Sequence, residues 1–346
     1  IDQTRGWANR LLLLNVILKG KPEPPYKAFL FQGHVLDEQG RKMSKSLGNV
    51  VDSEEMIDKY SADLYRFYLV WKASPIESMS FSEKEIMERP FQVLSTFFNL
   101  CKFFLQNAKY DNYSWDNFDI TKVNLSDLSY ADKWILSKTQ KLITNVTDYI
   151  ERARYHHALR ELENFIVNTL SRMYIPSIRQ EFWFEEDERK VMTRYAILFY
   201  VLLTVAKLMN PATPFITEYV YQNVFKQFSR NLSLSINLEE WPKHDEKFLF
   251  KEEKTLDVAF KVVPVILHAR QKAGIKRRWP LRKATLVIED SQVLEEAKKA
   301  RNLIEMLSNV KEVDFASDKR DLNLKLEVSL DLQKLGPKYK KKLGDI

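Results

Sequence analysis

The chain has 346 residues, of which 45% are hydrophobic and 12% aromatic, enough to fill the cores of two or three folded domains. A formal net charge of +7 favours polyanionic partners without identifying one. The single cysteine, Cys101, excludes an internal disulfide and a multi-cysteine zinc cluster, so a reducing, cytoplasmic location is expected. No apolar run reaches membrane-spanning length, and no membrane partner is expected.

The first segment combines polar residues with a long apolar run. Residues 2–7, Asp-Gln-Thr-Arg-Gly-Trp, lead into the run from Leu11 to Leu18, which Gly20 and nearby prolines end. The spacing predicts a buried helix from Trp7 to Leu18, and the opening residues taken alone are equally well explained as its polar start. Because Ile1 and not a methionine comes first, the chain is expected to be part of a longer protein.

Two short apolar stretches, Phe29–Phe31 and Val35–Leu36, are predicted as strands of a buried parallel sheet. They lead into Lys42-Met43-Ser44-Lys45-Ser46, here called the lysine loop, which Gly40 and Gly48 flank. Two ammonium groups on either side of a small hydroxyl residue suit a polyphosphate. Cations placed where negative charge develops on a transferring phosphate stabilise the transition state. An exposed basic turn is the alternative.

Helical patterns dominate the chain from residue 51 to about residue 241. Asp52 followed by Glu55 has the form of a capping box, so a helix should begin directly after the lysine loop. From Pro90 onward, apolar stripes recur at spacings of three and four residues, the pattern of antiparallel helices in a bundle. Cys101 falls within the first stripe and is expected to be an inert core thiol.

Three side chains of this bundle have chemistry that suits RNA, since arginine binds phosphates and base edges and tryptophan stacks on bases: Arg172, Arg179 and Trp183. The alternative is an ordinary surface charge for each arginine and a core indole for the tryptophan. The adjacent His156 and His157 have no cysteine or carboxylate at ligand spacing. A structural role is preferred for them, and no protein-bound metal is predicted.

A basic and aromatic cluster follows a helix predicted from Lys254 to Gly274. Such a cluster could follow a phosphate backbone while stacking a base, and a solvated linker is the alternative. Beyond it, strands at 284–288, 310–315 and 322–330 and a helix from Ser291, its predicted cap, to Leu307 indicate a small α/β module. The cluster comprises Lys276, Arg277, Arg278, Trp279 and Arg282.

Several of these strings resemble one enzyme family. The lysine loop, with Gly48-Asn49 behind it, resembles the KMSKS signature of class I aminoacyl-tRNA synthetases. Residues 2–7 are similar to the Asp-Gln-x-Arg-Gly-Trp segment of isoleucyl-tRNA synthetases, although Ala8 stands where that family usually has phenylalanine. Residues 171–179 resemble the isoleucyl type, residues 208–218 a helix junction of the class I anticodon-binding bundle, and residues 269–280 the archaeal and eukaryotic isoleucyl enzymes.

The resemblance implies a mostly α fold with five parts. Residues 1–50 would be the end of a Rossmann-like class I catalytic domain, and residues 51–89 stem-contact helices. Residues 90–243 would form the α-helical anticodon-binding bundle. Residues 244–282 would be a helix and basic linker, and residues 283–346 a small α/β C-terminal junction module.

The implied function is that of the C-terminal half of an isoleucyl-tRNA synthetase, an aminoacyl-tRNA ligase. Its substrates would be ATP with bound Mg²⁺, isoleucine and tRNA(Ile), and a monomer is expected. Lys42 and Lys45 would be catalytic and would bind ATP together with Met43, Ser44 and Ser46. The adenylate pocket would be bordered by Asp2, Gln3, Gly6 and Trp7. Contacts with tRNA are expected from Arg172, Arg179, Trp183, Lys276, Arg277, Arg278 and Trp279.

Two alternatives remain open. A valyl- or leucyl-type sister synthetase shares the loop and the bundle, and a non-catalytic tRNA-binding paralogue would keep the bundle alone. The chain contains no His-x-Gly-His segment, which binds ATP opposite the lysine loop in this family. By itself it is therefore expected to be inactive.

Overall fold

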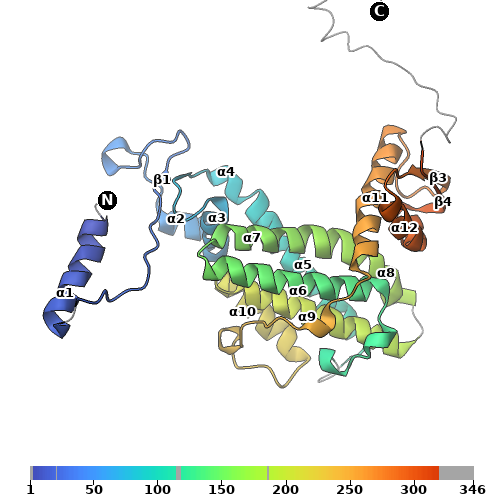
Figure 1. Ribbon diagram of the computed structural model, residues 1–346, viewed down its shortest axis with the longest axis horizontal. Helices are drawn as coiled ribbons and strands as arrows, with labels where there is room; N and C mark the ends of the chain where they lie inside the picture. The colour runs from blue at the N-terminus through green and yellow to red at the C-terminus, as the bar shows by residue number, and fades with distance from the viewer. Residues whose placement is uncertain (1–2, 21, 114–117, 185–186, 319–346) are drawn as a thin grey trace, which may run out of the picture. The chain divides into compact units, whose positions relative to one another are not determined.

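The computed structural model describes residues 3–20, 22–113, 118–184 and 187–318, and the backbone alone at residues 180, 181, 183 and 184 (Figure 1). Helices make up most of the described chain, and its strands form two short parallel pairs. The chain divides into two compact units, Ile1–Glu253 and Lys254–Ile346. The mostly helical fold predicted from the sequence is confirmed.

The first helix lies where the sequence predicts it. A π-helical stretch, Thr4–Asn9, continues into α1, Arg10–Lys19, and Gly20 ends α1 with φ of 66°. The predicted burial is wrong, because most of the apolar side chains are exposed, from 40% at Leu11 to 81% at Leu18, and Leu12 and Val16 are only half-buried. An apolar helix face is buried only where another element packs against it. The Asn15 side chain of α1 donates a hydrogen bond of 2.6 Å to the Glu23 carbonyl in the segment that follows the helix, and this contact does not cover the apolar face.

Two short strands, one before and one after the next two helices, form a parallel pair. β1, Val35–Leu36, pairs with β2, Met79–Ser80, which confirms a parallel strand at this point. Gly33 allows the approach of the two segments, since a Cβ there would lie 2.0 Å from the Glu77 carbonyl oxygen. Phe29–Phe31 forms no strand, contrary to the prediction. The described residues offer no further strand to pair with it, and its rings instead pack in a row behind Tyr26.

Two helices follow the lysine loop directly: α2, Ser53–Tyr60, and α3, Ala62–Lys72. The predicted cap is confirmed in part: Asp52 Oδ1 accepts from the amides of Glu54 at 2.8 Å and Glu55 at 3.4 Å, but the Glu55 side chain makes no return contact with the Asp52 amide in this described segment. Ser61 joins the helices with φ of 83° and ψ of 151°, a conformation that strains any residue other than glycine. A single-turn helix, α4, Glu83–Ile86, leads on to the bundle.

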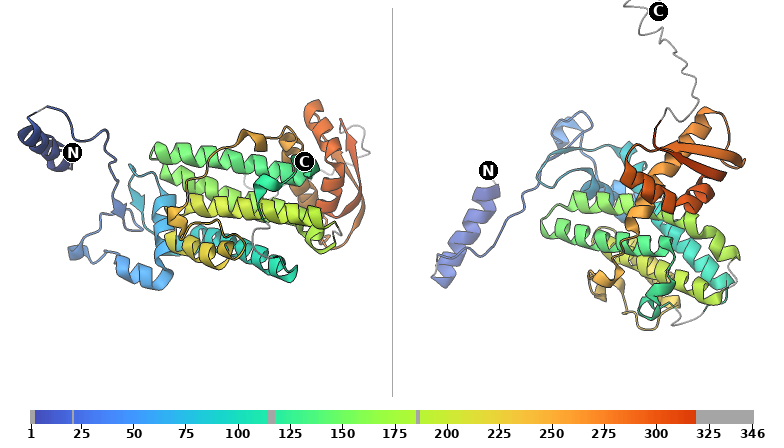
Figure 2. Two further views of the ribbon diagram at one scale, coloured as in Figure 1. Left: turned by 90° about the horizontal axis from the view of Figure 1, so that it is seen from below. Right: turned by 45° about the vertical axis from the view of Figure 1, so that its right-hand side comes forward.

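The bundle is built from long helices that lie alongside one another (Figure 2). Its apolar stripes meet in the core, where Phe104 and Tyr195 are fully buried. Cys101 is also fully buried, and burial raises the pKa of its thiol, so the predicted core position is confirmed. The helices are α5, Arg89–Tyr110; α6, Tyr130–Glu151; α7, Tyr155–Asn164, with the π-helical stretch Phe165–Tyr174; α8, Ile175–Phe184; α9, Glu188–Met209; and α10, Pro214–Asn223.

α9 is long and apolar enough to cross a membrane by length and composition, contrary to the expectation from the sequence that no apolar run reaches that length. Of its most apolar window, however, 72% is buried inside the structure. α9 packs against both α5 and α6. Its apolar surface is therefore explained by its position in the bundle core.

Two side chains of α3 hold the turn before α10. The Asp63 carboxylate accepts from the backbone amides of Phe215 at 3.2 Å and Ile216 at 2.5 Å. Arg66 donates to the carbonyls of residues 211 and 212 at 3.0 and 3.1 Å. Asp63 thereby satisfies first-turn amides at the positive end of the α10 dipole. We call these four contacts the α3–α10 tie.

The second unit contains a small α/β structure, in which the single helix predicted from Ser291 to Leu307 is divided into two. α11, Glu253–Lys272, leads to β3, Leu281–Val287; α12, Ser291–Lys299, and α13, Arg301–Ser308, connect β3 to the parallel strand β4, Val310–Ala316. Asp290 and not Ser291 caps α12, because Asp290 has the extended backbone and its carboxylate reaches the amides of the first turn at 2.8 and 3.0 Å. The strand predicted at 322–330 lies outside the described residues.

Candidate functional site

The lysine loop begins from a tight turn around Asp37. The Asp37 amide donates to the Arg41 carbonyl at 2.9 Å, and the Asp37 carbonyl accepts from the Gly40 amide at 2.9 Å. Gly40 has φ of 76°, which glycine adopts without strain. Asp37 Oδ1 accepts from the amides of Gln39 and Arg41 at 3.1 and 2.7 Å, and Oδ2 accepts from Arg41 Nε at 2.9 Å. One carboxylate thus organises the whole turn.

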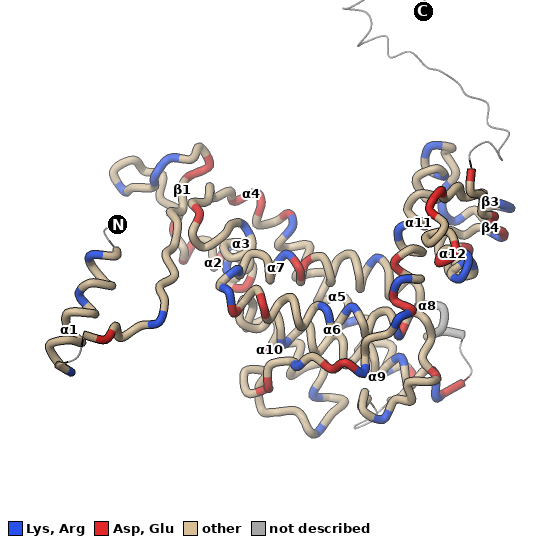
Figure 3. Tube along the Cα trace, in the orientation of Figure 1, with Lys and Arg blue, Asp and Glu red and all other residues tan. Residues whose placement is uncertain are grey.

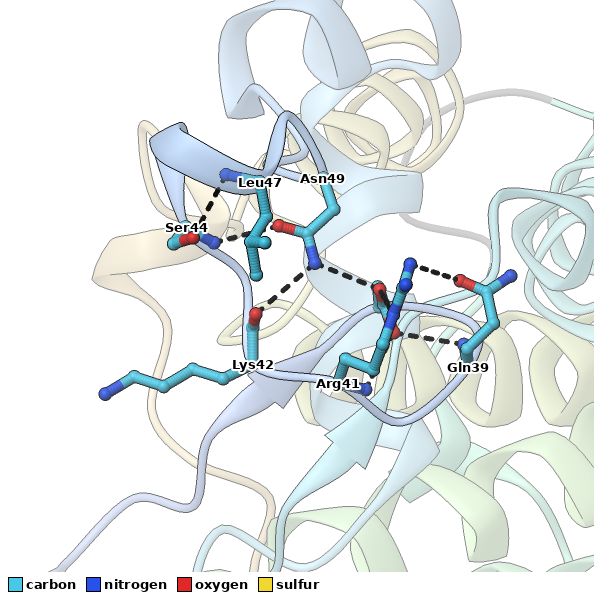
Figure 4. Close-up of polar contacts among 7 residues, drawn as sticks. Gln39, Arg41, Lys42, Ser44, Leu47 and Asn49 are labelled. Carbon is cyan, nitrogen blue, oxygen red and sulfur yellow. Dashed lines mark hydrogen bonds and ion pairs between the residues drawn. The ribbon is translucent and has the colours of Figure 1, made fainter.

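Asn49 closes the loop from its other end (Figure 4). Its Nδ2 donates to Asp37 Oδ2 at 2.9 Å and to the Lys42 carbonyl at 3.3 Å, while its Oδ1 accepts from the Ser44 amide at 2.9 Å. The Asn49 amide makes the largest contribution to lowering the pKa of Asp37 to about 2, with Arg41 adding to it and burial opposing it. Asp37 is therefore ionised at neutral pH and anchors a closed ring of hydrogen bonds.

The remaining loop residues form a short 3₁₀ turn, Lys45–Leu47. Ser44 caps it by accepting from the Leu47 amide at 3.3 Å, and the hydroxyls of Ser44 and Ser46 are 3.2 Å apart. Lys42 and Lys45 are exposed, and in the described part of the chain neither ammonium group has an ion-pair partner. Figure 4 shows the Lys42 side chain extending away from that of Asn49. Both cations are available to an external anion.

The opening segment, residues 2–7, was predicted to border the adenylate pocket. Gln3 and Trp7 are exposed, Trp7 to 66%, and Gly6 is half-buried. Asp2 lies outside the described residues. Gln3, Gly6 and Trp7 make no hydrogen bond, ion pair or ring contact with the lysine loop in the described part of the chain. The predicted pocket border therefore remains a prediction.

The arginines proposed for RNA contact lie on the bundle surface. Arg172 Nη1 donates to Asn168 Oδ1 at 3.0 Å, and the Arg179 guanidinium lies 6.0 Å from the centroid of the Phe103 ring. Both side chains are exposed. Because a guanidinium carries five N–H donors, each retains donors for a ligand. The Trp183 side chain lies outside the described residues.

The basic cluster forms a loop after α11, where Lys and Arg gather (Figure 3). Lys276 and Arg278 are exposed, and Trp279 is 60% exposed. The Arg278 guanidinium lies 5.9 Å from the centroid of the Trp279 indole. Arg277 differs, because its Nη2 donates to the Leu307 carbonyl at 2.8 Å. Part of its guanidinium is engaged in the fold.

The sequence analysis assigned no role to Asp37 or Asn49. Their signal was an aspartate at the start of a predicted turn and an asparagine directly after Gly48, both typical of side chains that bond to nearby backbone. In the described ranges, no group of three or more His, Cys, Asp or Glu side chains is placed to bind a metal ion.

Comparison with known proteins explains this combination of parts. Residues 132–285 match the model of the anticodon-binding domain of tRNA ligase, and residues 1–82 match that of the class I tRNA synthetases for I, L, M and V. The chain belongs to the class I aminoacyl-tRNA synthetases. The match at residues 1–82 includes the lysine loop, α2 and α3, and the match at residues 132–285 runs from α6 into β3.

The curated relatives of this synthetase chain include isoleucine–tRNA ligases. Those of Thermococcus kodakarensis and Pyrococcus furiosus are 38% and 36% identical over 91% of the chain, and that of Methanosarcina barkeri is 34% identical over 100%. The predicted resemblance to isoleucyl-tRNA synthetases is confirmed. The chain spans 29–32% of the length of these relatives.

A solved structure shares the fold of the synthetase chain. It is the ternary complex of an Agrobacterium radiobacter LeuRS with tRNA and LeuAMS. The match has a TM-score of 0.53 and 21% identity, and it covers 70% of this chain and 27% of that one.

Proposed function

We propose that the chain is the C-terminal part of an isoleucine–tRNA ligase, which activates isoleucine with ATP and transfers it to tRNA(Ile). The observation that carries the proposal is an identity of 34–38% to isoleucine–tRNA ligases across 91–100% of the chain. This similarity favours isoleucine over the valine and leucine alternatives. The lysine loop favours a catalytic chain over a purely RNA-binding paralogue.

In this proposal Lys42 and Lys45 stabilise negative charge on the phosphates of ATP as the adenylate and pyrophosphate form. Support comes from two exposed ammonium groups on a loop that Asn49 closes. Met43, Ser44 and Ser46 shape the loop, and Mg²⁺ enters with ATP as part of the substrate. Asp2, Gln3, Gly6 and Trp7 border the adenylate pocket.

The RNA-binding part is proposed to include exposed cations and aromatic rings of both units. On the bundle these are Arg172, Arg179 and Trp183, and in the second unit they belong to residues 276–279. The proposal also includes a monomeric enzyme in the cytoplasm. The match of residues 132–285 to an anticodon-binding domain supports an RNA role.

The test uses the full-length enzyme and isoleucine-dependent ATP–pyrophosphate exchange. Lys45→Ala should reduce exchange about 10²–10³-fold, the loss of roughly 2.7–4 kcal/mol expected for one transition-state donor, with isoleucine binding little changed. Lys109→Ala, which removes an exposed lysine at the end of α5, is the matched control and should leave exchange unchanged. Normal exchange in Lys45→Ala, or faster exchange with valine than with isoleucine, contradicts the proposal.

A further inference from the structure

Arg270 is a buried cation in the last turn of α11. Its side chain is 3% exposed, yet the described residues include no carboxylate that pairs with it. Its Nη1 donates to the Asn309 carbonyl at 3.2 Å. Its Nη2 donates to the carbonyls of Lys276 at 2.9 Å and Arg277 at 3.3 Å and to that of Trp279. A single guanidinium therefore donates hydrogen bonds to four backbone carbonyls.

Three of these carbonyls belong to the loop Lys276–Trp279, which begins just after Gly274 ends the helix with φ of 69°. The loop has one backbone hydrogen bond of its own, from the Trp279 amide to the Lys276 carbonyl at 3.1 Å. A buried charge without a counter-ion is unfavourable unless its donors are satisfied. Here Nη1 and Nη2 have carbonyl acceptors, whereas Nε has no partner among the described residues. The carbonyls stabilise the cation, and the cation in turn fixes the path of the loop.

All four side chains of the fixed loop are exposed, but they differ in their partners. The Arg278 guanidinium lies beside the Trp279 indole ring. Arg277 is partly engaged in the fold, because its Nη2 donates to the Leu307 carbonyl and its own carbonyl accepts from Asn309 Nδ2 at 2.9 Å. Lys276, Arg278 and Trp279 present two cations and one stacking surface, which is the chemistry that binds phosphates and an unpaired base.

We propose that Arg270 is a positioning residue that holds Lys276, Arg278 and Trp279 as one preformed contact face for tRNA, and that Arg277, one nitrogen of which is bonded to the fold, contributes less to this face. The proposal rests on the tRNA-binding function proposed above. A preformed loop loses less conformational entropy on binding than a mobile one. Arg270 itself is buried and therefore acts through the loop.

The test measures binding of a tRNA(Ile) transcript to the 346-residue chain by filter binding across a range of salt concentrations. The contact variant, Lys276→Ala with Arg278→Ala, should lower the slope of log affinity against log salt by about 0.7–0.9 for each lost phosphate contact. Trp279→Ala should weaken binding roughly 5–150-fold, as the loss of one base stack does. Arg270→Met should produce both effects, and Arg277→Met should produce neither in full.

A double-variant cycle distinguishes positioning from general damage. If Arg270 acts through the loop, the contact variant should have little further effect in the Arg270→Met background. Arg301→Met is the matched control: it removes a guanidinium from the same unit, 5.3 Å from the Phe315 ring, and should leave the contact variant at full effect. Arg270→Lys keeps the charge with fewer donors and should give an intermediate affinity. Circular dichroism verifies that each variant is folded.

Each outcome decides a different point. Additive effects of Arg270→Met and the contact variant, or normal affinity in Arg270→Met and Arg270→Lys, overturn the positioning role while the tRNA-binding function stands. A full loss of affinity in Arg277→Met without loss of folding overturns the smaller contribution assigned to that residue. If the unsubstituted chain binds no tRNA at low salt, both the RNA function and this inference are wrong.

Discussion

The hydrogen bonds of Asn49 should decide how well the lysine loop is ordered. Asn49→Ala removes the acceptor of the Ser44 amide, the donor to the Lys42 carbonyl and the donor to Asp37 Oδ2, bonds of 2.9, 3.3 and 2.9 Å. The two neutral hydrogen bonds contribute about 1–3 kcal/mol together, and the bond to the Asp37 carboxylate adds to them. From the neutral bonds alone the closed loop should open roughly 5–150 times more often, and the Ser44 amide should exchange its hydrogen faster by at least that factor.

The same substitution has a second, independent readout. Because the Asn49 amide makes the largest contribution to the lowered pKa of Asp37, that pKa should rise from about 2 towards its ordinary value of 3.8 in Asn49→Ala. A titration followed by NMR measures it. Asn49→Asp keeps the acceptor for Ser44 but replaces the donor by a carboxylate oxygen facing Asp37. Two carboxylates in contact cannot both stay ionised easily, so loop opening should become pH-dependent and decrease as the pair takes up a proton.

Ser46→Ala is the matched control, because it removes only the contact between two hydroxyls in the loop. Exchange of the Ser44 amide should stay close to the unsubstituted rate. Unchanged exchange and an unchanged Asp37 pKa in Asn49→Ala would show that the loop is ordered by something other than Asn49, and the reasoning would fail.

Further predictions concern stability and activity. Ser61→Gly should stabilise the chain by roughly 1 kcal/mol, because it removes backbone strain at φ of 83° and glycine replaces a capping serine at little cost; a lower urea midpoint would contradict this. Tyr221→Phe should destabilise it by about 1.5–3 kcal/mol in chemical unfolding, because it removes a hydrogen bond of 2.6 Å to the Glu239 carboxylate. Burial alone would raise the pKa of Glu239, but hydrogen bonds from Lys207, Tyr221 and the Ser233 amide outweigh it and lower the pKa to about 2 from 4.5. Its contribution to stability should thus be complete above about pH 4.5 and be lost as pH falls towards 2, and Glu239→Gln should flatten this part of the stability profile. The 346-residue chain should bind tRNA but show no isoleucine-dependent exchange, since it does not position the reactants opposite the lysine loop, and detectable exchange would contradict this.

Local features could be predicted from the sequence because their partners are a few residues away. The cap at Asp52 and the glycine end of α1 are of this kind, and both are confirmed. The strand predicted at Phe29–Phe31 was wrong because a strand forms only beside another strand, and the composition of three residues says nothing about a neighbouring strand. The helix from Trp7 was correct in position and wrong in burial for the same reason.

The candidate site divides in the same way. Lys42 and Lys45 could be proposed from residue type and spacing alone. The role of Asn49 depends on a turn that brings it back to Asp37, 12 residues earlier. Arg270 resembled any cation at a helix end, and its acceptor at Asn309 is 39 residues away in the sequence. A pattern of neighbouring residues contains no information about such contacts.

The α3–α10 tie limits how this chain can be cut or recombined. A segment that began at residue 90 would contain every long helix of the bundle but would leave the Phe215 and Ile216 amides without the carboxylate that caps them. Gene fusions that exchange bundles between synthetases should therefore succeed only when α3 is transferred with the bundle or when the recipient α3 supplies an aspartate at the same position. The smallest exchangeable segment would then include α3, which lies between the lysine loop and the bundle.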